Sequence, residues 1–507
     1  MGSKERVGMM ELKPEKLWRG LQIEEYSGDP DIIPAGFTYD SRRVVPGDFF
    51  VCIEGFQHDG HDFISEAVAG GCGGVVVQKD VPVPPGVNKI RVPNTRLALA
   101  HLSAAFYDHP SRKLRLIGVT GTNGKTTTTH LINAILREAG YKTGLIGTIH
   151  NRIGEEILPV ERTTPESLDL QELLYRMVKA GIDYCVMEVS SHALSLGRVA
   201  RCDFDMGVFT NISQDHLDFH QDMDEYFRAK RKLFTQLTLA SVKTGPKTAI
   251  INMDDQRGRE IAGHCPVSWL GYGVERETDL QAVAIDIGPR GAKFSARNKG
   301  KTVPISISLT GMFSIYNALA AAGAAIAEGI SLESIAKALA AVPGVAGRFE
   351  SIDEGQDFGV IVDYAHTPDG LENILRAANE FVPGRKILVF GCGGDRDRTK
   401  RPLMGKIAVT HADYVVVTSD NPRSEDPVAI IADIEPGLKE GGKSNGEYEI
   451  IPDRRQAIAA AIRMARKGDM VILAGKGHET YQIIGEEVLP FDDGAVAREV
   501  LRGKKEC

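Results

Sequence analysis

The sequence lacks the features that mark membrane-bound or secreted proteins. No apolar run approaches the roughly 20 residues that a membrane-spanning helix needs, and the N-terminal stretch MGSKERVGMMELKPEKLW has no apolar core. We therefore expect no membrane partner and no signal peptide. The seven cysteines are odd in number, scattered and without a C-x-x-C pair. This pattern argues against a disulfide framework or a zinc site, and a reducing cytoplasm is the expected location.

A basic excess is also absent. Lys and Arg total 60 against 68 Asp and Glu, a formal net charge of −8. Nucleic-acid-binding domains are usually basic, so we expect no nucleic-acid partner, although a local basic pocket could still bind an anionic small molecule. The 42% hydrophobic and 25% charged content is that of a globular protein. A chain of 507 residues is too long for one ordinary domain and suggests about three.

Three regions separate along the chain, and all three indicate an α/β fold. Residues 1–112 hold short apolar runs such as GDFFVCI and GGVVVQ between Gly and Pro turns, which predicts a small mixed α/β domain. Residues 113–345 open with a strand, a glycine loop and a helix. Residues 346–507 hold the apolar runs GVIVDYAH, KILVFGCGGDRD, YVVVTSDNPR and MVILAGKGHE, separated by helical patterns. That alternation predicts a parallel, doubly wound, Rossmann-like sheet.

The stretch VTGTNGKTTTTH, from Val119 to His130, is the strongest local motif. It departs from G-x-x-x-x-G-K-[ST] because Val119 occupies the first glycine position. Gly121 and Gly124 allow the backbone to curl so that its N–H groups face phosphate oxygens. Lys125 would neutralise phosphate charge and the Thr126 hydroxyl would ligate Mg²⁺. The alternative interpretation is a Gly/Asn turn that only caps a helix; the preceding strand and following helix favour nucleotide binding.

Other strand ends carry polar residues that fit this site. Glu188 follows an apolar strand in VMEVSSH, and His216 follows another in TNISQDHLDFH. Each is a candidate Mg²⁺ ligand, although such residues are more often helix caps or surface groups. Because ligands of parallel sheets bind outside the carboxyl ends of the strands, we expect an active site between the second and third regions.

An ordered set of motifs then indicates a family. It consists of TGTNGKTTT, EVSSHAL, NISQDHLDFH, YFRAKRKLF, GRFE, DYAHTPDGL, FGCGGDRDRTKRPLMG, TSDNPRSED and AGKGHE. Together they resemble the Mur ligases of peptidoglycan synthesis, from TYDSRRVVPGDFFV to the C-terminus. The resemblance implies a UDP-sugar-binding domain, a central P-loop ATPase-like domain and a C-terminal amino-acid-binding domain. In this family an apolar residue opens the loop, so Val119 fits.

The resemblance also implies an ADP-forming acid–amino-acid ligase of cell wall biogenesis. ATP phosphorylates the D-glutamate γ-carboxylate of UDP-N-acetylmuramoyl-L-Ala-D-Glu, and an amine displaces phosphate. Ligation requires ATP because an ionised carboxylate is a poor electrophile; the protein positions groups and neutralises charge. The motifs are most similar to those of the branch whose amine comes from meso-diaminopimelate. We expect a monomer.

Site residues follow from the same resemblance. The ATP-binding set is Gly121, Thr122, Asn123, Gly124, Lys125, Thr126, Thr127, Asn317 and Arg348. Thr126 and Glu188 match ligands of one Mg²⁺, and His216 of a second. Lys230 matches a lysine that takes up CO₂ and becomes a metal-binding carbamate; from spacing alone it would be a solvated helix lysine. Lys125, Lys230 and His216 form the predicted catalytic set.

Two substrate sets complete the prediction. The sugar-nucleotide set is Ser41, Gln57, His58, Thr163, Thr164, Ser190 and Arg198. The diaminopimelate set is Arg396, Asp420, Asn421, Pro422, Arg423, Gly475 and Glu479. Arg423 can meet a carboxylate with two parallel hydrogen bonds, and diaminopimelate differs from lysine by one carboxylate. Many of these residues are also ordinary turn and cap formers.

Three other interpretations remain open from the sequence. Folylpolyglutamate synthetase shares the ligase core, but DNPR and the uridine-type first domain argue against it. The L-lysine-adding relative has the same chemistry with a different amino-acid pocket. A nucleotide-gated binding protein of the GTPase type would carry N-K-x-D, which is missing here.

Overall fold

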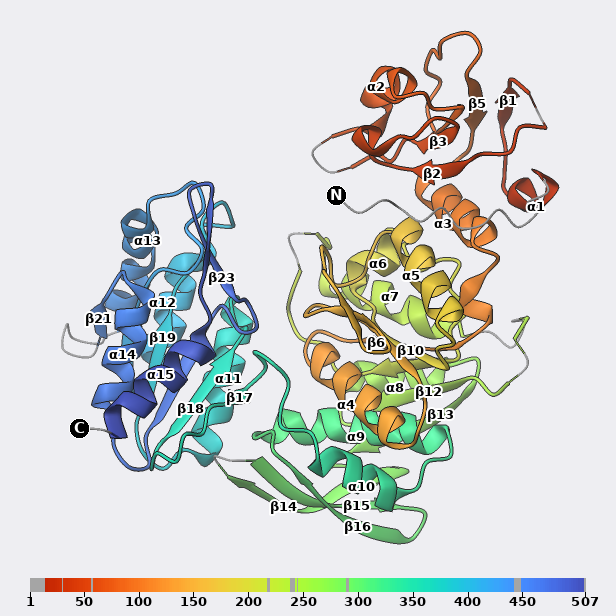
Figure 1. The fold of residues 1–507 in the computed structure, drawn as a ribbon. Helices are drawn as coiled ribbons and strands as arrows, with labels where there is room; N and C mark the ends of the chain where they lie inside the picture. The colour runs from red at the N-terminus through yellow and green to blue at the C-terminus, as the bar shows by residue number, and fades with distance from the viewer. Residues whose placement is uncertain are drawn as a thin grey trace.

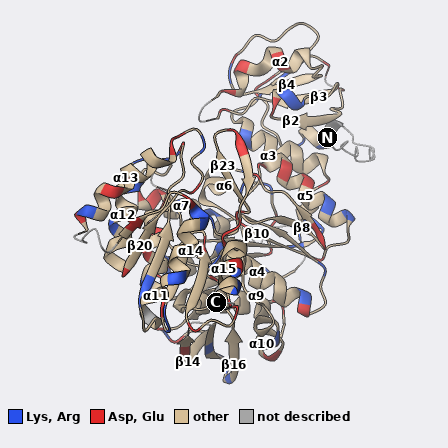
Figure 2. Cartoon of the chain, turned by 60° about the vertical axis from the view of Figure 1, so that its left-hand side comes forward, with Lys and Arg blue, Asp and Glu red and all other residues tan. Residues whose placement is uncertain are grey.

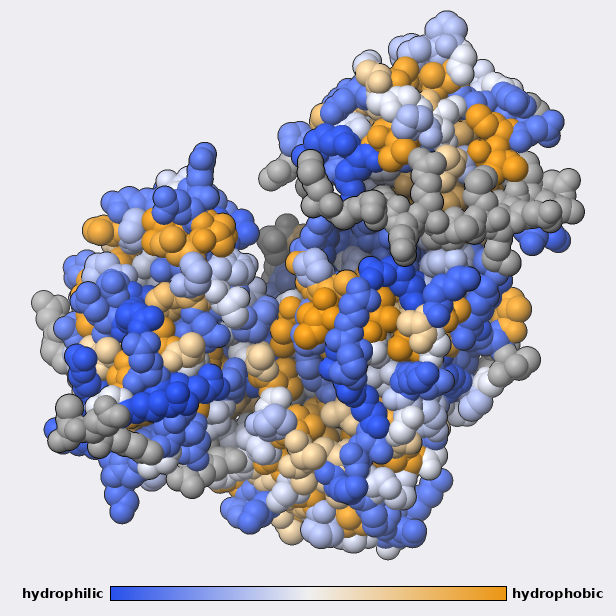
Figure 3. Space-filling view, in the orientation of Figure 1, coloured by the Kyte–Doolittle hydropathy of each residue, from blue (hydrophilic) through white to orange (hydrophobic). Residues whose placement is uncertain are grey.

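The computed structural model describes residues 14–29, 31–55, 58–216, 219–237, 242–243, 245–288, 291–441 and 448–505. It consists of three α/β regions that follow one another along the chain (Figure 1). The first lies at the upper right, the second below it, and the third to the left. Figure 3 shows a notch between the first and third regions. Lysine and arginine residues alternate with aspartate and glutamate residues along the helices (Figure 2).

The first region is a mixed sheet with the strand order β1-β5-β4-β3-β2. β1 is antiparallel to β5, and the other neighbours are parallel. Its elements are α1 (Pro14–Trp18), β1 (Glu25–Ser27), β2 (Gly36–Thr38), η1 (Ser41–Arg43), β3 (Asp48–Val51), η2 (Gly60–Phe63), α2 (Ile64–Ala69), β4 (Gly74–Val77), β5 (Asn88–Arg91), α3 (Thr95–Phe106) and η3 (Pro110–Arg112). The core is built from the buried faces of β3, β4 and α3.

The second region is a large sheet with the order β16-β15-β14-β13-β12-β11-β6-β10-β7-β8-β9. Its strands are β6 (Arg115–Thr120), β7 (Thr143–Ile146), β8 (Asn151–Ile153), β9 (Glu156–Leu158), β10 (Tyr184–Glu188), β11 (Met206–Phe209), β12 (Thr248–Asn252), β13 (Ser268–Gly273), β14 (Leu280–Gly288), β15 (Gly291–Asn298) and β16 (Lys301–Ile307). Its helices are α4 (Lys125–Glu138), α5 (Ser167–Lys179), α6 (Ser191–Ser195), α7 (Met223–Thr235), α8 (Gln256–Gly263), α9 (Met312–Ala327) and α10 (Leu332–Ala340).

The centre of this sheet is parallel, from β7 through β10, β6, β11 and β12 to β13. The strands from β7 to β12 are buried on both faces, which is why their sequences are nearly continuous apolar runs, whereas β13 begins with two exposed residues. Helices α4 and α9 pack on one face, and α5 and α7 on the other. Antiparallel strands extend both edges. In β15, for example, buried and more exposed positions alternate, as expected of a strand with one face toward the core.

The third region is the predicted doubly wound sheet, ordered β17-β18-β22-β19-β20-β21. All neighbours are parallel except β17 with β18. Its elements are β17 (Glu350–Ser351), β18 (Gly359–Asp363), α11 (Pro368–Phe381), β19 (Lys386–Phe390), α12 (Lys400–His411), β20 (Tyr414–Val417), α13 (Pro427–Glu440), β21 (Tyr448–Ile450), α14 (Arg454–Met464), β22 (Met470–Ala474), the hairpin β23 (Tyr481–Ile484) and β24 (Glu487–Pro490), and α15 (Asp493–Lys505). Helices α11, α12 and α13 cover one face, and α14 and α15 the other.

Candidate functional site

The predicted nucleotide loop connects β6 to α4 at the centre of the second sheet. Gly121 has φ 153° and Gly124 has φ 84°, values that favour glycine. A Cβ on Gly124 would lie 2.2 Å from Asn317 Oδ1, and one on Gly121 would lie 1.9 Å from Thr210 Oγ1. Both glycines are therefore required for close packing as well as for conformation. Asn317, predicted to contact the nucleotide, lies directly against the loop.

The end of the neighbouring strand β11 fixes the loop. The Thr122 and Asn123 N–H groups donate to the carbonyl and the side-chain oxygen of Asn211, at 2.9 and 3.0 Å. The Thr210 hydroxyl donates to the Asn123 carbonyl at 2.7 Å. Thr127 is buried in the first turn of α4. On the β11 side the loop is thus held by hydrogen bonds between uncharged groups, at a helix N-terminus that favours anions.

Two lysines converge on the carbonyl of Gly121. Lys125 Nζ donates to Gly121 O at 2.9 Å and to Thr122 O at 2.7 Å. Lys230 Nζ, on α7, donates to the same Gly121 oxygen at 2.8 Å and lies 4.3 Å from the centre of the Tyr226 ring. Lys230 is 1% exposed. Burial, and then the charge of Lys125, hold the pKa of Lys230 well below its usual value. A neutral amine is the form that can react with CO₂.

The predicted metal ligands Thr126 and Glu188 lie together. The Thr126 hydroxyl donates to Glu188 Oε2 at 3.0 Å, and the Glu188 side chain is at the buried end of β10. His216 has φ 55°; its Nε2 is 3.3 Å from Asp215 Oδ2, and its ring centre is 6.0 Å from that of Tyr226, which also contacts Lys230. Among the described residues no three His, Cys, Asp or Glu side chains form a metal cluster. The predicted set instead combines a hydroxyl, a carboxylate, an imidazole and a lysine.

Arg348 lies against the nucleotide loop. Its Nη2 donates to Thr126 Oγ1 at 3.4 Å, and its guanidinium carbon is 4.9 Å from the Tyr364 ring centre. Its position at the junction of the second and third regions predicts that it contacts ATP when the domains close, and in this structure the guanidinium already lies at the start of α4. Backbone packing explains this reach, because a Cβ on Gly347 would lie 2.0 Å from His478 N and Tyr364 N donates to Gly347 O at 2.9 Å.

Part of the sugar-nucleotide set adjoins the metal pair. Thr164 Oγ1 donates to the Glu188 carbonyl at 2.8 Å and accepts from Ser190 N at 3.1 Å. Arg198 Nη1 donates to Thr164 O at 3.2 Å, and Thr163 Oγ1 is 3.1 Å from Thr148 Oγ1. These residues form one polar group at the ends of β7 and β10.

The remaining sugar-nucleotide residues belong to the first region. Ser41 Oγ donates to Glu66 Oε2 at 2.9 Å, and the His58 ring packs edge-on against Phe63, with centres 6.2 Å apart. Gln57 lies outside the described residues. The structure gives these residues local partners and leaves their role a prediction.

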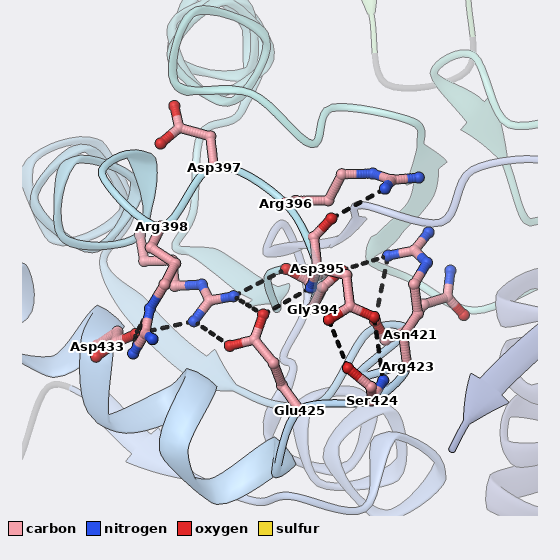
Figure 4. A network of polar contacts seen from close by, with 12 residues as sticks. Gly394, Asp395, Arg396, Asp397, Arg398, Asn421, Arg423, Ser424, Glu425 and Asp433 are labelled. Atoms are coloured by element: carbon pink, nitrogen blue, oxygen red, sulfur yellow. Dashed lines mark hydrogen bonds and ion pairs between the residues drawn. The ribbon is translucent and has the colours of Figure 1, made fainter. Parts of the chain in front are cut away.

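The diaminopimelate set comes together at the carboxyl ends of β19, β20 and β22. Arg423, with φ 53°, donates through Nη1 to Gly394 O at 2.8 Å, and Arg396 Nη1 donates to Asp395 O at 3.0 Å (Figure 4). Asp395 in turn accepts from Ser424 Oγ at 2.6 Å. A Cβ on Gly394 would lie 1.8 Å from Pro422 O, so the two loops meet backbone to backbone.

The acidic side of this pocket is more deeply buried. Asn421 Nδ2 donates to Glu479 Oε2 at 2.8 Å. Burial raises the pKa of Asp420, against the opposing charges of Arg454 and Lys476. Gly475, with φ 113°, lies beside the Asp420 carboxylate. The arrangement places guanidinium and carboxylate groups around one strand-end edge.

Sequence reasoning did not select two residues that touch these sites. Thr148 bonds to Glu188 and Thr163. Lys476 is fully buried, and its Nζ is 3.2 Å from both Asn421 Oδ1 and Glu479 Oε2. Lys476 lies in the motif AGKGHE between Gly475 and Glu479, which the sequence does assign to the pocket, so the motif could have indicated Lys476 as well. Thr148 follows β7 without a motif of its own.

Family models match all three regions. The Mur ligase family catalytic domain matches residues 35–107, the Mur ligase middle domain 119–325, and the Mur ligase glutamate ligase domain 347–477. A UDP-N-acetylmuramoyl-L-alanyl-D-glutamate--2,6-diaminopimelate ligase of Syntrophomonas wolfei is 50% identical over 97% of this chain and 100% of its own length. The protein of that name from Geobacillus thermodenitrificans is 49% identical over 94% of this chain and 96% of its own.

A comparison with solved structures gives the same family. A structure of a UDP-N-acetylmuramoyl-L-alanyl-D-glutamate--2,6-diaminopimelate ligase shares 32% identity and a TM-score of 0.69, covering 98% of this chain and all of that one. The chain therefore belongs to the Mur ligase family, and it is an ATP-dependent, ADP-forming amide ligase of peptidoglycan precursor synthesis. The nucleotide-gated binding protein is thereby excluded as its main role. None of the described helices is long and apolar enough to cross a membrane.

Proposed function

We propose that this Mur ligase joins the amine of meso-2,6-diaminopimelate to the D-glutamate γ-carboxylate of UDP-N-acetylmuramoyl-L-Ala-D-Glu. The nearly full-length relatives named for this reaction support the proposal. We assign residues 1–112 to the sugar nucleotide, 113–345 to ATP and 346–507 to the amino acid. The enzyme would act as a monomer in the cytoplasm, where ATP is available.

The first half-reaction takes place at the loop. The segment from Gly121 to Thr127 would bind the triphosphate mainly through the backbone N–H groups at the start of α4, because those of Thr122 and Asn123 already donate to Asn211. Lys125 would turn from its carbonyl partners toward phosphate oxygens. Arg348 already points at Thr126 and would add a second positive charge. The γ-carboxylate oxygen attacks the γ-phosphorus of ATP and ADP leaves, giving an acyl phosphate. The amine then attacks the acyl carbon, phosphate leaves, and the amine proton is lost.

Mg²⁺ would be held by Thr126, Glu188, His216 and Lys230, and when bound it neutralises phosphate charge. The paired hydroxyl and carboxylate of Thr126 and Glu188 suit this hard cation. Lys230 suits it only as a carbamate. Its burial and the charge of the nearby Lys125 lower its pKa and so favour the neutral amine that forms one. We therefore assign a CO₂-derived carbamate to Lys230.

The observation that carries the choice of amino acid is the placement of Arg396, Arg423 and Glu479 in the loops at one edge of the third sheet. The guanidinium of Arg423 would bind the distal carboxylate of diaminopimelate, and Glu479 the distal ammonium. Both described bonds of Glu479 end on Oε2, which leaves Oε1 for that ammonium. L-Lysine lacks the distal carboxylate, so the two arginines would have no carboxylate partner when it binds. This loss should weaken its binding by about 1–3 kcal/mol.

Measuring the rate of phosphate release tests the proposal. With the sugar nucleotide and ATP supplied, we expect release to need an amino acid and to be fastest with meso-diaminopimelate. Release that is independent of the amino acid, or absent with the sugar-nucleotide dipeptide, would contradict the assignment.

A further inference from the structure

The carboxylate of Glu188 is held mainly by one residue, Thr148, the second residue after β7. Thr148 N donates to Glu188 Oε1 at 2.8 Å, and the Thr148 hydroxyl donates to Oε2 at 3.1 Å. The only other described bond to this carboxylate comes from Thr126 at 3.0 Å. Thr148 thus supplies two of three donors to a group that is 1% exposed.

The approach of the β7 loop to Glu188 is close. A Cβ on Gly147 would lie 2.5 Å from Glu188 Oε1. A side chain at residue 147 would therefore push the carboxylate away from Thr148. The loop Gly147–Thr148 packs against Glu188 with little room for adjustment.

The same Thr148 hydroxyl is 3.1 Å from the hydroxyl of Thr163. A hydroxyl has one proton, and a carboxylate can only accept. Because the Thr148 proton is directed to Glu188, the proton between the two hydroxyls must come from Thr163. The Thr163 oxygen then offers only lone pairs to any further partner.

We infer that Thr148 is a positioning residue that fixes Glu188 and, by accepting the Thr163 proton, makes Thr163 a hydrogen-bond acceptor for the sugar-nucleotide substrate. This inference rests on the proposed function, which makes Glu188 a metal ligand and Thr163 a substrate contact. The partner of Thr163 is then an amide N–H or a hydroxyl of the muramoyl dipeptide. Phosphate and carboxylate oxygens, which only accept, do not fit this position.

Thr148→Val and Thr148→Ser separate this role from a packing role. Valine keeps the shape and the backbone N–H but removes the hydroxyl. We expect Thr148→Val to lower kcat about tenfold or more, to raise the Mg²⁺ concentration for half-maximal rate, and to raise KM for the sugar nucleotide about fivefold to tenfold. KM for diaminopimelate should not change. Thr148→Ser should stay within about threefold of the unmodified enzyme.

A double-mutant cycle tests the link to Thr163. If the hydroxyls act as a pair, Thr148→Val together with Thr163→Val should raise KM for the sugar nucleotide by less than the product of the single effects. Thr410→Val is the control: this exposed threonine on α12 bonds only locally, through its hydroxyl to Lys406 O at 2.7 Å. It should leave all constants unchanged.

The inference would be overturned if Thr148→Val left the Mg²⁺ dependence and the KM for the sugar nucleotide unchanged, or if Thr148→Ser were as impaired as Thr148→Val. Fully multiplicative effects in the double-mutant cycle would also overturn it. So would a neutron structure in which the Thr163 deuteron points away from Thr148. Thermal unfolding of each variant identifies misfolding, and in that case the neutron structure of the unmodified protein decides. Failure of the proposed function would appear separately, as no amino-acid-dependent phosphate release by the unmodified enzyme.

Discussion

The nucleotide site and the amino-acid pocket are built by opposite means. Hydrogen bonds between uncharged groups join the loop Gly121–Gly124 to Thr210, which donates, and to Asn211, which accepts. Charge pairs hold the pocket: the fully buried Arg401 guanidinium donates to both carboxylate oxygens of the partly exposed Glu425, at 2.9 and 2.8 Å.

The difference follows from what each site binds. A loop that must wrap a polyanion uses backbone N–H groups, which stay in place whatever the ionic strength. A pocket that must tell one amino acid from another needs side-chain charges, and those charges have to be oriented by others. The pocket should therefore be the more sensitive of the two sites to the loss of a single charged residue.

The largest expected effect concerns the base of the pocket. Arg454 and Asp493 form a fully buried ion pair at 2.8 and 2.6 Å, and Arg454 Nη2 also donates to Ala474 O at 3.0 Å. Arg454→Met leaves Asp493 buried without its partner and should destabilise the protein by about 3–5 kcal/mol. Urea unfolding measures this. The neighbouring exposed Arg455, paired with Glu499, is the control, and Arg455→Met should cost less than about 1 kcal/mol. An equal loss of unfolding free energy in the two variants would contradict the claim that the buried ion pair is the more important one.

Lys230 tests the nucleotide side. Lys230→Ala removes the group assigned as a carbamate and should lower kcat by roughly a hundredfold to a thousandfold. Formate or acetate should restore part of the rate, because a small carboxylate can occupy the vacated space. Lys232→Ala, an exposed lysine on the same helix, should be neutral. A Lys230→Ala enzyme with near-normal turnover would show that no carbamate is needed.

Arg423 tests the selectivity of the pocket. Arg423→Ala should raise KM for diaminopimelate about tenfold to a hundredfold and leave KM for ATP unchanged, because its described bonds are all within the third region. Initial rates over both substrate concentrations measure the two constants. An equal rise in both would mean that the substitution disturbs the domain and not the amino-acid contact.

The smallest effect is a pH dependence of stability at the nucleotide helix. Burial lowers the pKa of His130 to about 4, and its Nδ1 is 2.9 Å from Thr126 O. His150, Arg152 and Arg348 face it and oppose its protonation. Its pKa is thus depressed on folding, so the unfolded chain binds the proton first. Stability should fall as the pH drops from about 6.5 toward 4, by up to about 2 kcal/mol between pH 7 and 5. His130→Gln should reduce that slope in urea unfolding, and an unchanged slope would exclude His130 as its source.

Prediction from the sequence succeeds where the pattern is local. Strand β6, the loop and helix α4 follow from one apolar run, two glycines and helical spacing, and the strands β18, β19, β20 and β22 follow from their apolar runs. The substrate residues follow from the resemblance to the Mur ligases, because their local sequences fit ordinary turns and caps equally well. The structure adds what depends on distant contacts. Spacing alone predicts a solvated lysine at position 230, because its burial against the Gly121 carbonyl and the Tyr226 ring arises only in the folded chain. The antiparallel strands β14 to β16 and the contact of Gly347 with His478 were also not predicted, since both depend on pairings fixed by the folded chain.

The most direct test of the account compares kcat/KM for meso-diaminopimelate and L-lysine in the unmodified enzyme and in Arg423→Ala, with ATP and UDP-N-acetylmuramoyl-L-Ala-D-Glu saturating. We predict that the unmodified enzyme prefers diaminopimelate by roughly tenfold to a hundredfold or more and that Arg423→Ala loses most of this preference. Equal use of both amino acids by the unmodified enzyme, or a preference that survives the loss of Arg423, would contradict the account.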